Sequence, residues 1–283
     1  MAFSLSSLIP ARWRGGQPVI PVVRLSGTIG GGGAFRSGLT LQGLAGPLAR
    51  AFGMKFAPAV ALVINSPGGA AAQSHLIFQR IRALAEEKDK AVIVAVEDVA
   101  ASGGYMIAAA GDHIIVDEGS IVGSIGVVSA GFGFTGLIER IGVERRVHTA
   151  GKSKAMLDPF RPEREEDVAR LRAIQEDIHA AFIGLVRQRR GGALADDPEL
   201  FSGAFWSGKK AVELGLADRV GDLRSVLRER YGDRVRLKVI PTERSMLRRR
   251  LGLGGGSDPF AASLVERVVA VIDEHLAWNR FGL

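Results

Sequence analysis

The chain has 283 residues, of which 47% are hydrophobic and 24% are charged, the composition of a globular protein with a substantial core. It contains no cysteine, which excludes disulfides, thiolate metal sites and a cysteine nucleophile. The net charge of +7 suits nucleic acid or an anionic membrane. The arginine clusters, however, lack interleaved aromatic residues that would stack on bases, so we expect no nucleic-acid partner.

The N-terminal stretch does not have the pattern of a targeting segment. Pro10, Arg12 and Arg14 interrupt the apolar core that a secretory signal would need. The sequence also lacks an apolar run of about 18 residues that could span a bilayer. We therefore expect residues 1–17 to be a flexible leader, and the protein to be cytoplasmic or peripheral at the inner face of the membrane.

Short apolar runs alternate with amphipathic stretches in the first half of the chain. The runs predict strands at residues 19–25, 59–64, 91–96 and 113–116. The amphipathic stretches predict helices at residues 39–52 and 70–87. A strand that is apolar on both alternating faces is typical of a parallel sheet that is covered on both sides. The pattern therefore predicts an α/β fold with a mostly parallel sheet flanked by helices.

The second half continues this pattern with longer helices. A short helix is expected at 137–141 and a strand at 143–149, followed by a long charged helix at 162–190. Three further elements complete a main domain of residues 18–242: a short helix within 205–220, a helix at 223–231 and a strand at 235–240.

The remaining tail divides into a linker and a helix. Residues 243–259 are basic and then glycine-rich, as expected of a linker. Residues 260–283 have apolar side chains at four-residue steps with charges opposite them, which predicts an amphipathic C-terminal helix. Such a stripe is usually an interface with protein. Peripheral contact with a membrane is the second option, which the upstream arginines favour.

Ser102 stands at a corner between an apolar run and a helix of small residues. Gly103 and Gly104 follow it and allow a sharp turn, which would place the hydroxyl beside the free N–H groups of the new helix. This position suits a nucleophile, although a plain helix N-cap explains the serine equally well locally. The Pro-Gly-Gly turn at 67–69 leaves N–H groups for an oxyanion hole, or is an ordinary strand-to-helix turn.

A serine nucleophile requires a base beside it. None of the five histidines accompanies a Gly-x-Ser-x-Gly elbow, so each is better explained as an ordinary surface or core residue. A lysine can serve if burial keeps its amine neutral. Lys152 and Lys154 lie in a loop among small uncharged residues. Because alternate residues of an extended segment point opposite ways, we expect only one of them to face Ser102.

Several segments together resemble the signal peptide peptidase A (SppA) family over residues 19–225. In order, they are Asn-Ser-Pro-Gly-Gly at 65–69, Ala-Ser-Gly-Gly-Tyr at 101–105, Gly-Ser-Ile-Gly-Val at 123–127, Lys154 ahead of an Asp-Pro step, and residues 208–221. The resemblance implies the Clp-protease/crotonase-like fold, with repeated β-β-α/βαβ units around a mostly parallel sheet.

The resemblance also implies a Ser-Lys catalytic dyad without metal or cofactor. It assigns Ser102 as the nucleophile and Lys154 as the general base, because Lys154 keeps the family's spacing before the Asp-Pro step. It places the N–H groups of Gly69 and Gly103 in the oxyanion hole. Ser124 is assigned to help orient the lysine amine.

The expected function is that of an ATP-independent serine endopeptidase acting on short or unfolded peptides, such as signal-peptide remnants. Relatives form ring-like oligomers, sometimes with a neighbour's residues completing the site, so a homo-oligomer is expected. Family members commonly carry an N-terminal membrane anchor, which this sequence lacks; this departure weakens the expectation of membrane-embedded substrates. Two alternatives are a crotonase-like acyl-CoA enzyme, which uses the same kind of oxyanion hole, and a catalytically silent scaffold.

Overall fold

The computed structural model describes residues 17–30, 38–242 and 275–282. Within these residues, one 8-stranded sheet has the order β6-β5-β3-β2-β1-β8, with β4 paired to β3 and β7 paired to β4. The strands are β1 (Val19–Ser26), β2 (Ala59–Ser66), β3 (Ala91–Ala101), β4 (His113–Val116), β5 (Ile121–Gly123), β6 (Phe205–Ser207), β7 (Arg219–Val220) and β8 (Arg236–Ile240). The pairing of β5 with β6 is antiparallel. All the other strand pairings in the described sheet are parallel.

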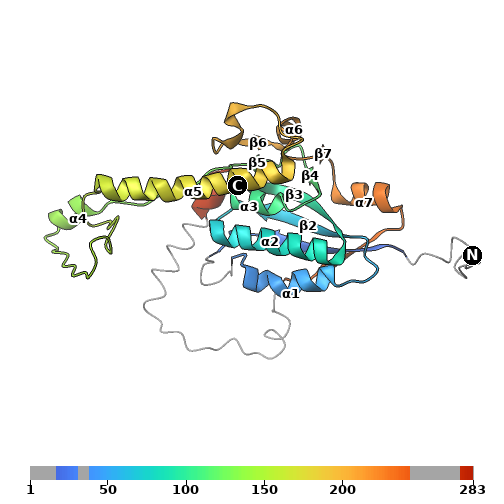
Figure 1. The fold of residues 1–283 in the computed structure, drawn as a ribbon, viewed down its shortest axis with the longest axis horizontal. Helices are drawn as coiled ribbons and strands as arrows, with labels where there is room; N and C mark the ends of the chain where they lie inside the picture. Colours follow the sequence, from blue (N-terminus) through green and yellow to red (C-terminus); the bar gives the residue numbers. More distant parts are fainter. Residues whose placement is uncertain (1–16, 31–37, 243–274, 283) are drawn as a thin grey trace, which may run out of the picture.

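Helices cover both faces of the sheet (Figure 1). They are α1 (Leu41–Phe52), α2 (Ala71–Lys88), α3 (Gly103–Ala108), α4 (Thr135–Arg140), α5 (Glu165–Arg190), α6 (Gly208–Glu213) and α7 (Leu223–Tyr231), with a 3-10 turn at Pro198–Phe201. The larger core lies between the sheet and helices α1, α2, α3 and α5. A smaller core lies between the other face and α7. The sheet is thus buried on both sides, which explains the continuous apolar runs of β2 and β3.

Strand β3 changes partners along its length. Its first half pairs with β4 and its second half pairs with β5. Between the halves the register with β2 shifts, because Ile64 lies opposite Val96 whereas Ser66 lies opposite Ala100. Extra residues on β3 therefore form a bulge just before the corner at Ser102, and a bulge bends and twists the strand that contains it.

Side chains from two neighbouring segments hold this bulge. The Asn65 amide oxygen accepts a hydrogen bond from the Val99 N–H at 3.3 Å, and its amide nitrogen donates to the Asp98 carboxylate at 2.5 Å. On the other side, the Ser120 hydroxyl donates to the Glu97 carbonyl at 2.6 Å. These bonds replace ladder contacts that the bulge interrupts, so the end of β3 has a fixed direction.

Most predicted elements are present, and three differ from expectation. The strand predicted at 91–96 continues through the bulge to Ala101. The start of the helix predicted within 205–220 is instead β6, because this segment pairs with β5. The strand predicted at 143–149 is wrong, since these residues have no regular structure and Val143 is 52% exposed.

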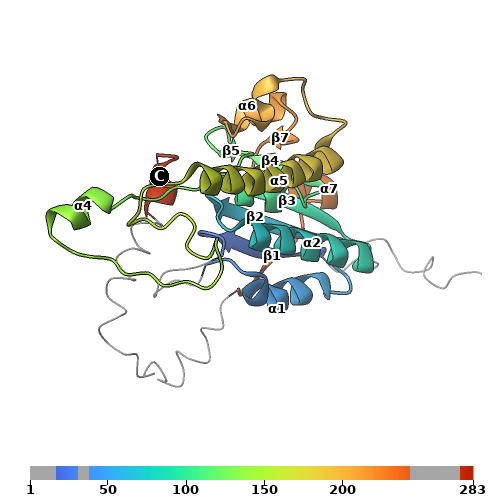
Figure 2. The same cartoon turned by 60° about the vertical axis from the view of Figure 1, so that its left-hand side comes forward.

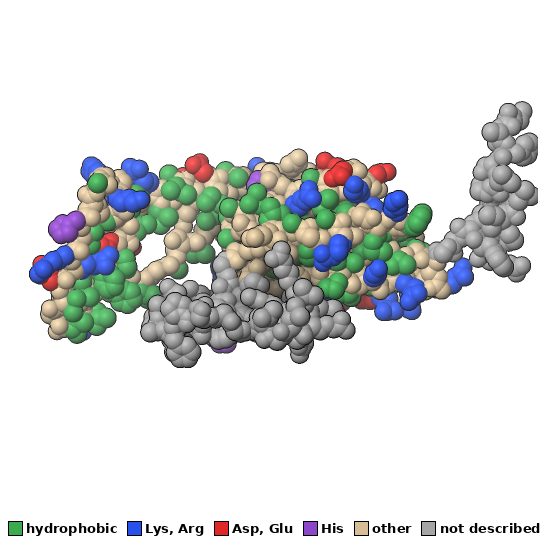
Figure 3. All heavy atoms as spheres, turned by 90° about the horizontal axis from the view of Figure 1, so that it is seen from below, with side chains coloured by type: hydrophobic (Ala, Val, Ile, Leu, Met, Phe, Trp, Pro, Cys, Tyr) green, Lys and Arg blue, Asp and Glu red, His purple; other side chains and the backbone are tan. Residues whose placement is uncertain are grey.

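Residues 127–162 project from the body, and we call this segment the arm (Figures 1 and 2). It contains α4 and exposes large apolar side chains: Val128, Phe132, Phe134, Leu137, Ile141 and Val143. Figure 3 shows apolar side chains on this end of the molecule beside lysine and arginine side chains. The arm therefore has the composition of a surface that another chain can cover.

The C-terminal residues that the structure describes, 275–282, pack against the end of β3. The predicted linker at 243–259 lies outside the described residues, as does most of the predicted tail helix, of which residues 275–279 are helical. Phe281 is 8% exposed and contacts Val99 and Ala101. Its ring also meets Phe205 edge-on, with the ring centroids 5.1 Å apart. Among the residues that the structure describes, none of the helices combines the length and the apolar character needed to cross a membrane.

Candidate active site

Ser102 occupies a strained corner between β3 and α3. Its φ of 51° and ψ of −121° are unfavourable for a residue with a side chain, at a cost of about 1–3 kcal/mol. Its N–H donates to the Gly123 carbonyl at 2.8 Å, and its carbonyl accepts from the Met106 N–H at 3.0 Å. Its side chain makes no capping hydrogen bond to the helix within the described residues. The N-cap explanation therefore does not account for this hydroxyl.

The Pro-Gly-Gly turn lies directly against Ser102. A Cβ added to Gly68 would stand 2.9 Å from the Ser102 Cβ and 2.9 Å from the Gly103 nitrogen. The Gly68 N–H donates to the Ser66 hydroxyl at 3.2 Å, whereas the N–H groups of Gly69 and Gly103 have no partner among the described residues. Two free donors thus belong to segments that meet at the candidate nucleophile, which is the arrangement that stabilises an oxyanion.

Gly69 has little room for any other residue. It forms a parallel bridge with Ile29 through the backbone groups of its two neighbours, so its own N–H faces away from Ile29. Its φ is 142°, and an added Cβ would lie 2.1 Å from the Ile29 carbonyl oxygen. This packing fixes the direction of the free N–H.

Replacing Gly69 with alanine should destabilise the fold by roughly 3 kcal/mol, because the new methyl group forces the backbone away from Ile29. Thermal unfolding of the purified variant measures the effect. Gly136→Ala in α4 is the matched control, because an added Cβ there has no atom within 4 Å. Equal midpoints for the two variants would contradict this account of the turn.

Ser124 lies next to the same corner. It follows Gly123, whose carbonyl binds the Ser102 N–H, and it is 3% exposed. Like Ser102 it has a positive φ, 53°, and its N–H donates to the Ala204 carbonyl at 2.7 Å. The structure thus brings together four of the predicted residues, namely Ser102, Gly103, Gly69 and Ser124.

The candidate lysines lie apart from this group in the single chain. Lys154 is an exposed residue of the arm, and its backbone N–H donates to the Gly151 carbonyl at 3.2 Å. Lys152 has a side chain that is 84% exposed and lies 3.9 Å from the Glu166 carboxylate. Within the described residues no hydrogen bond joins either lysine to Ser102.

The loop after Lys154 is ordered by a nearly buried carboxylate. The Asp158 side chain is 4% exposed and lies 3.0 Å from the Arg145 guanidinium. The Phe160 N–H, together with Arg145, lowers the pKa of the Asp158 carboxyl. Asp158 therefore stays ionised and joins its own loop to the segment of the arm that carries Arg145.

Tyr105, the last residue of the Ser-Gly-Gly-Tyr motif, anchors α3 in the core. It is fully buried, and its hydroxyl donates to the Leu216 carbonyl at 2.9 Å. Burial raises the pKa of this phenol far above its ordinary value, so it remains a neutral donor. The helix that begins beside Ser102 is thereby fixed to the segment between α6 and β7.

Sequence reasoning missed three residues that shape the site. Asn65 supports the bulge, and its place in the Asn-Ser-Pro-Gly-Gly motif was the available signal. Trp206 covers Gly123 so closely that an added Cβ would lie 2.8 Å from its ring. The His179 Nε2 lies 3.0 Å from the Ile125 carbonyl, a contact across 54 positions that no local pattern indicates.

Comparisons with known proteins identify the family and the fold. The model of peptidase family S49 matches residues 84–234. A putative protease of Synechocystis sp., slr0021, is 32% identical over 232 residues, which cover 80% of this chain and 81% of that protein. The lysine-to-alanine mutant of the membrane-bound stomatin-specific protease 1510-N, solved with a substrate peptide, has a TM-score of 0.52 at 16% identity and covers 90% of this chain and 99% of that one.

One longer relative is named as an antiporter rather than as a protease. The Na(+)/H(+) antiporter NhaA of Brucella abortus is 56% identical over 286 residues, which cover 99% of this chain but only 39% of that protein. This chain therefore spans well under half of that relative, and most of the relative's length has no counterpart here. The family match and the fold confirm the resemblance to the SppA family and the Clp-protease/crotonase-like architecture. The chain belongs to peptidase family S49.

Proposed function

We propose that this protein is an ATP-independent serine endopeptidase with Ser102 as the nucleophile and Lys154 as the general base. The observation that carries the proposal is the corner itself. An uncapped serine hydroxyl stands on a strained turn, against a second turn, and each turn supplies a free N–H. Structures of similar fold include a serine-to-alanine and a lysine-to-alanine mutant of the stomatin-specific protease, and this choice of residues supports a Ser-Lys dyad.

The reaction would proceed by acyl transfer. The neutral Lys154 amine accepts the Ser102 proton while Oγ attacks the peptide carbonyl carbon. The N–H groups of Gly69 and Gly103 stabilise the negative charge on the carbonyl oxygen. The lysine ammonium then protonates the leaving amine as the C–N bond breaks. Water, deprotonated by the lysine, hydrolyses the ester and regenerates Ser102.

A second copy of the chain would complete this site. A lysine works as a base only where its amine is shielded from water, and Lys154 is exposed in the single chain. The arm that carries it also exposes apolar side chains such as Phe132, which is 78% exposed. A neighbouring copy packed on the arm would cover both features at once. We therefore include a homo-oligomer in the proposal.

The proposed substrates are short or unfolded peptides, with signal-peptide remnants as one source. Without a nucleotide-driven unfolding step, a folded protein could not present an extended backbone to the corner at Ser102. The stomatin-specific protease of similar fold is described as membrane-bound, and we include a peripheral position at the inner membrane face in the proposal.

The reaction class can be tested with the wild-type protein. We expect a fluorophosphonate probe to label it stoichiometrically, and we expect cleavage of a quenched fluorescent peptide without ATP, because both require an activated serine. Acyl-CoA thioesters serve as the control substrates. Thioester turnover without serine labelling would favour a crotonase-like enzyme, and absence of labelling and of turnover would favour a scaffold.

A further inference from the structure

The segment after β5 connects Ser102 to α5. Residues 124–127 begin beside Gly123, whose carbonyl binds the Ser102 N–H. On one side, the Ser124 N–H donates to the Ala204 carbonyl at 2.7 Å. The Ile125 side chain is fully buried in the larger core. The segment is thus fixed toward β6 and toward the core, and its remaining side faces α5.

His179 fixes that remaining side. Its half-buried ring projects from α5, with Nε2 3.0 Å from the Ile125 carbonyl oxygen. A carbonyl oxygen can only accept, so Nε2 carries the proton and donates it. Across the described residues, no other hydrogen bond joins α5 to residues 124–127. This imidazole therefore determines how far the segment stands from the helix.

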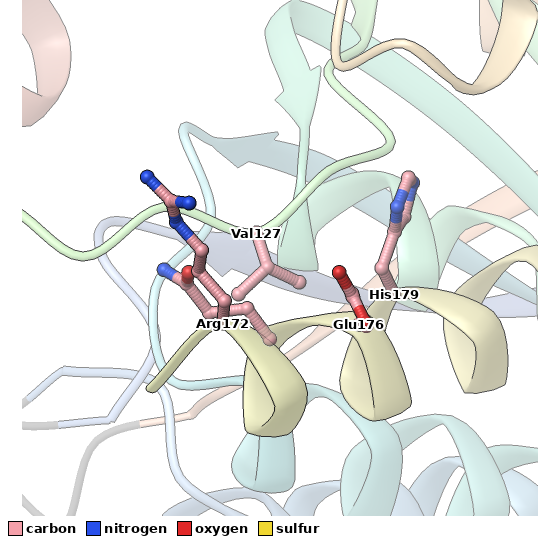
Figure 4. Close-up of a pocket in the computed structure, with 5 residues that line it drawn as sticks. Val127, Arg172, Glu176 and His179 are labelled. Atoms are coloured by element: carbon pink, nitrogen blue, oxygen red, sulfur yellow. The ribbon is translucent and has the colours of Figure 1, made fainter. Parts of the chain in front are cut away.

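A pocket opens at the end of the same segment. It has a volume of about 210 Å³ and is lined by Val127, Arg172, Gln175, Glu176 and His179. In Figure 4, Glu176 and His179 project from α5 on one side of Val127, and Arg172 lies on the other. Four residues span at most roughly 14 Å, so a short peptide bound at Ser102 can reach this pocket.

The backbone at the pocket, at Val127 and Val128, is open to a ligand. The N–H and carbonyl groups of Val127 and Val128 have no hydrogen-bond partner in the described part of the chain. An extended peptide can add to such an edge through its own backbone. The edge is useful only if its position is fixed, because each ångström of displacement weakens several hydrogen bonds together.

We propose that His179 is a positioning residue that fixes residues 124–127 and thereby the position of the peptide-binding edge at Val127 and Val128. This inference rests on the proposed peptidase function. His179 touches neither Ser102 nor the reacting atoms, so its effect is on the binding of extended substrates. A substrate too short to reach the pocket is insensitive to it.

The test compares His179→Gln, His179→Phe and His179→Ala with the wild-type protein. Glutamine supplies an N–H donor, whereas phenylalanine keeps a ring of similar size without one. For a quenched peptide of about eight residues, we expect KM to rise roughly fivefold in the phenylalanine and alanine variants and less than about twofold in the glutamine variant. We expect kcat, the fluorophosphonate labelling rate and the KM of a dipeptide ester to stay unchanged.

An unchanged KM for the long peptide in His179→Phe would overturn the inference. Equal KM increases for the dipeptide ester and the long peptide would overturn it too, because they indicate general damage. The glutamine and phenylalanine pair decides the matter even if His179→Ala does not fold. A wild-type protein that resists the fluorophosphonate refutes the proposed function itself. If the wild-type protein is labelled but the KM for the long peptide is unchanged in the His179 variants, only the role of His179 is refuted.

Discussion

Replacing Ser102 with alanine should lower peptide turnover by roughly 10,000-fold or more, because the acyl-enzyme forms on its Oγ. Fluorophosphonate labelling should disappear with it. The comparison is made on purified protein, with a quenched fluorescent peptide for turnover and mass spectrometry for the labelled site. A Ser102→Ala variant that retains activity would show that the strained corner has another purpose.

Ser102→Gly provides the matched control for this strain. The corner has φ 51° and ψ −121°, a conformation that glycine adopts easily and that alanine, like serine, does not. Both variants should be inactive, but the glycine variant should be more stable than the alanine variant by about 1 kcal/mol. Chemical denaturation measures the difference. The reverse order would mean that the corner relaxes once the hydroxyl is removed.

Lys154→Ala should lower kcat by roughly 1,000-fold, because it removes the group that takes the Ser102 proton. Lys152→Ala should stay within about twofold of the wild type, since its side chain is 84% exposed and lies 3.9 Å from a carboxylate. Turnover of the same peptide and the rate of fluorophosphonate labelling give the comparison. Full labelling of Lys154→Ala would refute the assignment of the base.

Co-expression of Ser102→Ala with Lys154→Ala tests whether the lysine comes from a second copy. Each variant alone lacks one half of the dyad. If a neighbour completes the site, mixed assemblies recover up to about one quarter of the wild-type activity by random assortment. If the lysine acts within its own chain, mixing recovers no activity. Variants that are mixed only after separate purification control for slow subunit exchange.

The sheet could be predicted from the sequence because burial on both faces leaves an unmistakable composition. Strand β2 and the first half of β3 are apolar at successive positions, as expected of strands that are covered on both faces. Residues 143–149 contain two β-branched valines among polar residues, yet the arm offers no strand to pair with them. Periodicity describes which faces are apolar, but pairing requires a partner that sequence spacing does not identify.

The sequence predicts the parts of the site that depend on neighbouring residues, but it does not predict contacts between distant segments. Ser102 and Gly69 are marked by glycine turns at strand ends, which the chain order alone reveals. The bond between His179 and Ile125 joins a mid-helix histidine to a loop carbonyl, and neither residue has a distinctive neighbourhood. In the proposed homo-oligomer, the position of Lys154 depends on the copy that covers the arm, which the sequence of one chain does not reveal.

The change of partners along β3 divides the domain into regions that can evolve at different rates. Substitutions along β4 and β7, which pair with the first half of β3 and with each other, are constrained by the framework of the fold. Those along β5, residues 124–127 and the arm act on the surroundings of Ser102. The bulge, held by Asn65, lies between the two regions. A lineage could therefore exchange its substrates while inheriting the same scaffold unchanged.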